Sequence, residues 1–88
     1  MSRFIVVHTI NLTEEYLRVA ATDFVRGSFP EGVPWNKSYC DFDDDKFFCD
    51  WEAPDKETLE QVFKQIEMPF DVIYPVRIFD IATAELEA

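Results

Sequence analysis

The alternation of hydrophobic and polar positions divides the chain into strand-like and helix-like segments. In chain order, the predicted elements are a strand at 3–10, a helix at 13–26, strands at 35–42 and 46–53, a helix that begins at 54–55, and a strand at 71–81. Proline and glycine residues predict a loop at 28–34. The last residues, 83–88, lack either pattern, and we expect them to form a flexible tail.

Both predicted helices carry one apolar stripe. In the first, Leu17, Ala20 and Phe24 recur at helical spacing. Asn11 is the expected N-terminal cap, and Gly27 stands where a left-handed C-terminal cap is needed. The stripe of the second helix spans two turns and consists of Leu59, Val62, Phe63 and Ile66. Each helix therefore has one face to bury against a sheet.

The element order β-α-β-β-α-β predicts an α+β fold of the ferredoxin-like kind, a four-stranded antiparallel sheet with both helices on one face. Eighty-eight residues, 1–88, suffice for a single domain with one hydrophobic core. The first and last strands are nevertheless apolar on both sides, so the face without helices needs a cover. A second copy stacked sheet to sheet supplies that cover, and we expect a homodimer of the dimeric α/β-barrel type.

The hairpin formed by the second and third strands is dense in aromatic and acidic residues. If residues 43–46 form a four-residue turn, Cys40 lies opposite Cys49. One more residue in the turn would pair Cys40 with Phe48 instead. The facing cysteines are then either two inert core thiols or the partners of a reversible disulfide or a soft-metal site.

Charge narrows the choice of partners. Eighteen acidic residues against eight basic ones give a formal net charge of -10. Such a surface repels nucleic-acid phosphates and anionic lipid headgroups, so we expect neither a nucleic acid nor a membrane as partner. The N-terminal segment resembles neither a signal peptide nor a membrane span, and two cysteines fit a reducing compartment, which predicts a cytoplasmic protein. The sequence shows no nucleophile and base pair, phosphate-binding glycine loop or metal motif, which favours a non-enzymatic binding protein.

His8 is the only histidine, on a strand whose neighbouring positions are apolar. It is either a core or interface histidine, or a ligand on the open face of the sheet. Nickel and zinc sites need several ligands, so a metal site would draw on both copies of a dimer. The candidate ligands are His8, Asp41, Cys49 and Asp50. The acidic turn at 43–45 is either a solvated turn or a site for a hard cation.

A small-ligand pocket between the sheet and its partner is a further hypothesis. Its candidate residues are Tyr39, Phe48, Asp50, Tyr74 and Arg77. In this hypothesis Arg77 holds an anion and a carboxylate acts as a base, whereas interface packing explains the same residues without a ligand. The alternative function is a cofactor-free monooxygenase or isomerase, by analogy with other dimeric α/β barrels. That enzyme requires a convergence on one cavity of His8, Tyr39, Asp50 and Arg77.

One sequence pattern runs from the hairpin to the residues after the second helix. Its matching positions are Ser38, Tyr39, Asp45, Lys46, Phe48, Cys49, Glu52, Ala53, Pro54, Asp55 and Pro69. In these positions the chain resembles a family of small ferredoxin-fold domains of unknown function that is related to a nickel-binding protein. The resemblance implies nickel or another divalent metal as a cofactor. The family pattern has a His near the position of Val62, and this chain has no His there. The missing histidine argues against a bound metal.

Overall fold

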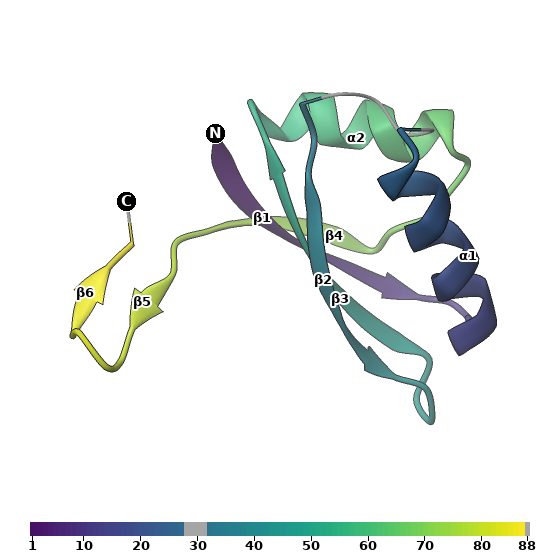
Figure 1. The fold of residues 1–88 in the computed structure, drawn as a ribbon, viewed down its shortest axis with the longest axis horizontal. Helices are drawn as coiled ribbons and strands as arrows, with labels where there is room; N and C mark the ends of the chain where they lie inside the picture. The colour runs from purple at the N-terminus through teal and green to yellow at the C-terminus, as the bar shows by residue number, and fades with distance from the viewer. Residues whose placement is uncertain (28–31, 88) are drawn as a thin grey trace.

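The computed structural model describes residues 1–27 and 32–87 (Figure 1). Its elements are β1 (Ser2–Thr9), α1 (Glu14–Val25), β2 (Trp35–Asp41), β3 (Lys46–Ala53), α2 (Lys56–Gln65), β4 (Val72–Val76), β5 (Phe79–Asp80) and β6 (Glu85–Leu86). The first four strands form one antiparallel sheet in the order β2-β3-β1-β4. Both helices lie on the same side of this sheet (Figure 1), so the predicted ferredoxin-like α+β fold is confirmed. Neither of the helices in the described ranges is long and apolar enough to cross a membrane.

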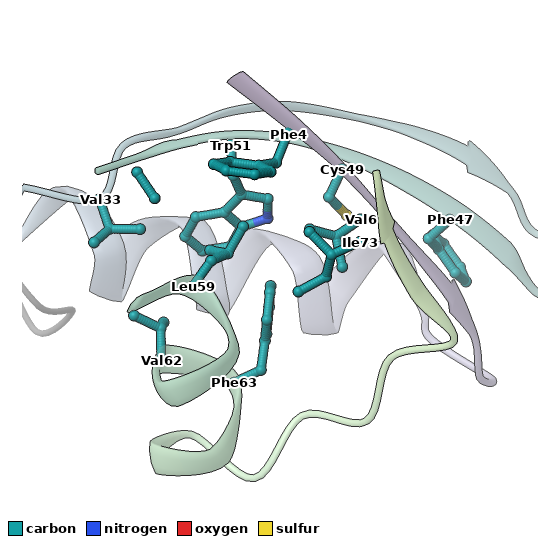
Figure 2. Close-up of a cluster of buried hydrophobic side chains, with 11 residues drawn as sticks. Phe4, Val6, Val33, Phe47, Cys49, Trp51, Leu59, Val62, Phe63 and Ile73 are labelled. Carbon is teal, nitrogen blue, oxygen red and sulfur yellow. The ribbon is translucent and has the colours of Figure 1, made fainter. Parts of the chain in front are cut away.

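The core lies between the sheet and α2 (Figure 2). Alternate residues of the sheet point toward the helices, among them Phe4, Val6 and Trp51, which are at most 3% exposed. Helix α2 meets them with a buried stripe of Leu59, Val62 and Phe63. Helix α1 packs less closely, because its apolar residues Leu17 and Phe24 are only partly buried.

The ends of α1 differ in part from the prediction. Thr13, not Asn11, caps the helix, and its hydroxyl accepts a hydrogen bond from the Tyr16 N–H at 3.0 Å. Asn11 instead donates to Asp45 Oδ1 across the hairpin turn at 3.2 Å. At the other end Gly27 adopts φ +83°, the left-handed conformation predicted for it. The predicted loop at 28–34 lies in part outside the described residues.

The predicted register of the hairpin was wrong by two residues. The turn spans residues 42–45, so Cys40 lies opposite Phe47 and Cys49 lies opposite Ser38. A shift of two keeps every side chain on its predicted face, because the side-chain period of a strand is two. An irregularity between Trp35 and Lys37 then brings Trp35 opposite Trp51 on the helix side of the sheet.

The predicted last strand is also shorter than expected. β4 ends at Val76, after which β5 and β6 pair with each other in a small antiparallel hairpin. This hairpin, the C-terminal arm, stands away from the sheet on the side opposite the helices (Figure 1). The predicted tail at 83–88 therefore contains a paired strand, and the arm leaves apolar side chains in solvent, those of Phe79, Ile81 and Leu86.

Candidate functional site

The described residues form one hollow on the helix side of the sheet and two adjoining hollows near the base of the C-terminal arm. The first, the helix-side cavity, has a volume of about 230 Å³ and lies between α1, α2 and the inner face of the sheet. Its lining is mostly apolar and aromatic, formed by His8, Leu12, Tyr16, Leu17, Val19, Ala20, Asp23, Trp35, Cys49, Trp51, Phe63, Ile66 and Met68. The cavity exists because α1 packs less closely on the sheet than α2 does.

His8 projects from β1 onto the wall of the helix-side cavity and is only 3% exposed. Its Nδ1 lies 2.7 Å from the carbonyl oxygen of Pro69. Burial lowers the pKa of His8, although the Pro69 hydrogen bond and the nearby Asp71 carboxylate oppose that shift. Near neutral pH the ring is therefore uncharged, Nδ1 carries the proton that it donates to Pro69, and Nε2 keeps a lone pair.

Three aromatic rings that contact one another form part of the cavity wall. Trp35 and Trp51 stack with ring centroids 5.6 Å apart, and Phe63 meets Trp51 edge to face at 5.3 Å. Cys49 lies on the same wall and accepts a hydrogen bond from the Ser38 hydroxyl at 3.0 Å. Burial raises the pKa of the Cys49 thiol, so the thiol is protonated near neutral pH. The deep part of the cavity is thus aromatic and uncharged.

The second hollow lies on the open face, which we define as the face of the sheet away from the helices. This open-face hollow measures about 500 Å³ and reaches from the sheet to the base of the C-terminal arm. It is lined by Arg3, Ile5, Lys37, Tyr39, Asp50, Val76, Arg77, Ile78 and Glu87. Three cations thus outnumber two carboxylates around this hollow, although the whole chain is strongly acidic.

Asp50 is the unusual group of the open face. Its side chain is only 7% exposed, and its Oδ2 accepts a hydrogen bond from Arg3 Nη1 at 3.1 Å. The other oxygen, Oδ1, is buried and has no hydrogen-bond partner among the described residues. A buried carboxylate oxygen without a donor is costly. Oδ1 has almost no accessible surface, so a ligand or a partner group would gain this hydrogen bond by displacing the side chains that cover it.

The residues predicted for a ligand pocket are largely brought together. Tyr39, Asp50 and Arg77 line the open-face hollow. Phe48 and Tyr74 share the open face but do not line the hollow; they flank Val7 and Ile5 in neighbouring strands and are 40% and 52% exposed. The predicted residues therefore share one face of the sheet, and three of them help to line the hollow.

The residues predicted as metal ligands are divided between the two faces. His8 and Cys49 line the helix-side cavity, whereas Asp50 lies on the open face. Asp41 pairs with Lys46 at the far end of the hairpin, and its Oδ1 already accepts the Asp44 N–H at 3.1 Å. Within residues 1–27 and 32–87, no three His, Cys, Asp or Glu side chains are grouped to hold a metal ion. The described residues of one chain therefore do not fit a nickel site.

Two groups of lining residues were not among those predicted from the sequence. Arg3 and Lys37 border the open-face hollow, and a cation within an otherwise apolar strand such as β1 is a signal that could have identified Arg3. Trp35 and Asp23 border the helix-side cavity, and only the irregularity in β2 turns Trp35 inward. Such an irregularity has no reliable sequence signal here.

Comparison with known proteins identifies relatives of this fold. A family model described as nickel responsive protein SCO4226-like matches residues 4–76, which reach from β1 to the end of β4. Among solved structures, the crystal structure of SCO4226 from Streptomyces coelicolor A3(2) is similar, with a TM-score of 0.70 and 22% sequence identity, over 85% of this chain and 95% of that chain. A comparison with curated proteins gives no match. The chain thus belongs to the SCO4226-like family of nickel responsive proteins.

Proposed function

We propose that the protein is a non-enzymatic binding protein that acts as a homodimer and holds a small ligand in the open-face hollow. The observation that carries this proposal is the buried Asp50 carboxylate, whose Oδ1 lacks a partner among the described residues. A binding site with one oriented acceptor surrounded by cations and an aromatic ring is typical of small-molecule recognition. Two free cysteines, Cys40 and Cys49, support a cytoplasmic location for this protein.

The lining of the hollow indicates the class of ligand. Asp50 Oδ1 needs a hydroxyl or N–H donor, while Lys37 and Arg77 favour an anionic group on the same molecule. Tyr39 offers a ring for stacking at the rim, where it is 58% exposed. A small aromatic acid with a hydroxyl group, of which 4-hydroxybenzoate is a simple example, meets all three requirements.

The apolar surface around the hollow supports the proposed dimer. Phe48 and Tyr74 are exposed on the open face beside the half-buried Ile5 and Val7. In a soluble monomer such a contiguous apolar surface is costly, and a second copy stacked sheet to sheet would cover both surfaces at once. The C-terminal arm stands on the same side of the sheet and would cover part of the second copy with its apolar side chains.

Nickel is the second candidate ligand, because the family description names a nickel response. Since one chain does not group three ligands within its described residues, a nickel ion would need ligands from both copies. Of the metal ligands predicted from the sequence, Asp50 and Asp41 lie on the open face and are the candidates for such a shared site. His8 and Cys49 would contribute only to a separate site on the helix side of the sheet.

The residues required by the enzyme hypothesis do not lie around one cavity. A cofactor-free monooxygenase or isomerase required His8 to converge with Tyr39, Asp50 and Arg77 on one cavity. His8 borders the helix-side cavity, and the other three border the open-face hollow, so the sheet separates them. We therefore retain the binding protein and do not propose this reaction.

Native mass spectrometry of the purified protein tests the proposal, with 4-hydroxybenzoate, nickel and zinc added separately. We expect a dimer that takes up 4-hydroxybenzoate, and we expect Asp50→Asn to lose that added mass. Asp43→Asn is the matched control, because Asp43 is an exposed acid in the hairpin turn, outside the hollow. A monomer, or equal uptake by the wild type and Asp50→Asn, would contradict the proposal. Uptake of nickel by the dimer alone would favour the second candidate.

A further inference from the structure

The helix-side cavity carries an inference that is independent of the open-face hollow. Protein interiors are close-packed and contain few voids larger than a water molecule. An apolar cavity of about 150 Å³ is enough to bind benzene. The cavity beneath α1 measures about 230 Å³, and α1 keeps Tyr16 and Val19 about half exposed beside it. This space is therefore large enough for an aromatic molecule of one or two rings.

We propose that the helix-side cavity is a second binding site, for a small neutral aromatic molecule that carries one hydrogen-bond donor. The ligand ring would lie against Trp35, Trp51 and Phe63, whose own contacts already follow stacked and edge-to-face geometry. The donor would bond to His8, because Nε2 is the one ring nitrogen without a partner among the described residues. A phenol or an N–H heterocycle has this chemistry.

The charges around the cavity exclude other ligand classes. The deep polar groups, His8 and Cys49, offer no fixed charge to a cation or an anion. Asp23 is exposed at the rim, so it repels carboxylates and phosphates that approach the cavity. The site therefore differs in ligand class from the open-face hollow, where cations prevail.

The two tryptophans make the binding measurable. They are the only two in the chain, and both border the cavity, so their fluorescence reports its occupancy. The probe is 4-bromophenol, whose bromine quenches tryptophan emission on contact. Its methyl ether, 4-bromoanisole, lacks the donor, and 4-bromobenzoate carries a negative charge. We expect saturable quenching by 4-bromophenol, at about tenfold lower concentration than by 4-bromoanisole, the ratio that one hydrogen bond supplies. We expect 4-bromobenzoate to bind most weakly.

Neighbouring alanines of α1 provide matched variants. Ala20 lines the cavity and is half-buried, whereas Ala21 is exposed and does not line it. Ala20→Phe fills the space and should weaken 4-bromophenol binding at least about tenfold, while Ala21→Phe should leave it within about twofold. His8→Phe should remove the preference for 4-bromophenol over its methyl ether. Asp50→Asn, on the other side of the sheet, should change nothing, which separates this site from the open-face hollow.

Two results would overturn the inference. One is quenching that rises linearly without saturation and is equal in Ala20→Phe and Ala21→Phe, which indicates surface collisions. The other is tighter binding of 4-bromobenzoate than of 4-bromophenol. Should Ala20→Phe fail to fold, NMR of the wild type decides the question without a variant. Nuclear Overhauser contacts between 4-bromophenol and the tryptophan indole protons are expected, and their absence at saturating probe contradicts the proposed site.

Discussion

Two adjacent valines of β1 point to opposite faces of the sheet, and replacing each one tests this assignment. Val6 points into the core and is 0% exposed, whereas Val7 points to the open face and is half-buried. Replacing either by alanine changes strand propensity equally, so a difference between the two variants reports the packing around each side chain. Val6 lies between Cys49 and Ile73 in the neighbouring strands, and both are also buried.

The expected magnitude follows from the burial of Val6. Valine to alanine removes two methyl-sized groups, worth roughly 0.8 kcal/mol each in transfer free energy, and leaves a void that adds to the loss. We therefore expect Val6→Ala to lower the free energy of unfolding by about 2 to 3 kcal/mol. A domain of this size has a total stability of roughly 3 to 5 kcal/mol. Val6→Ala should thus remove about half of the stability.

Urea unfolding followed by tryptophan fluorescence measures this loss at two protein concentrations. Val6→Ala should lower the free energy of unfolding by the same amount at both protein concentrations. The urea midpoint should fall accordingly, and the dependence of the free energy on urea concentration should stay unchanged. Val7→Ala should cost less than Val6→Ala at low protein concentration. The cost of Val7→Ala should increase as the concentration rises, because the proposed dimer would bury the open face. Equal costs for both variants at every concentration, or a cost for Val6→Ala below about 1 kcal/mol, would refute the assignment of the two faces.

Three further predictions concern single groups. Because burial lowers the pKa of His8, the protein takes up a proton at this residue when it unfolds below about pH 6.5. The free energy of unfolding should therefore fall as pH decreases, by at most about 1.4 kcal/mol per pH unit from this group. In urea titrations, His8→Gln should reduce this pH dependence. Gly27→Ala should cost about 1 kcal/mol in thermal unfolding, because φ +83° strains any residue with a Cβ, and an unchanged midpoint would contradict this. Iodoacetamide should alkylate exposed Cys40 in the native protein and reach buried Cys49 only on unfolding, which peptide mass spectrometry can check.

The sequence predicted the fold because its strongest signals are periodic. The stripe from Leu59 to Phe63 and the alternation in β1 identify which face each element buries, and both agree with the structure. The register of the hairpin was missed because a shift of two residues preserves that alternation, so hydrophobicity alone cannot choose between the two pairings. Turn geometry decides it, with Asp45 at φ +53° as the last turn residue.

The candidate sites were predictable only in part. Tyr39 and Asp50 share the open-face hollow, as their alternating positions in β2 and β3 suggested, and Arg77 joins them just after the end of β4. The burial of Asp50 was not predictable, because it depends on contacts between strands, among them the ion pair with Arg3, which lies far away in sequence. His8 has the parity of Phe4 and Val6, which places it on the helix side. The helix-side cavity depends on how far α1 stands from the sheet, and local sequence patterns do not encode that distance.

Sedimentation velocity of the wild type and Phe48→Lys at micromolar concentration tests the central claim most directly. Phe48 is 40% exposed on the open face, so a lysine there should leave the fold intact but place a charge in the proposed interface. Ala21→Lys, on the exposed side of α1, is the control. We expect the wild type and Ala21→Lys to sediment as dimers and Phe48→Lys as a folded monomer. A wild type that sediments as a monomer would contradict the dimeric binding protein.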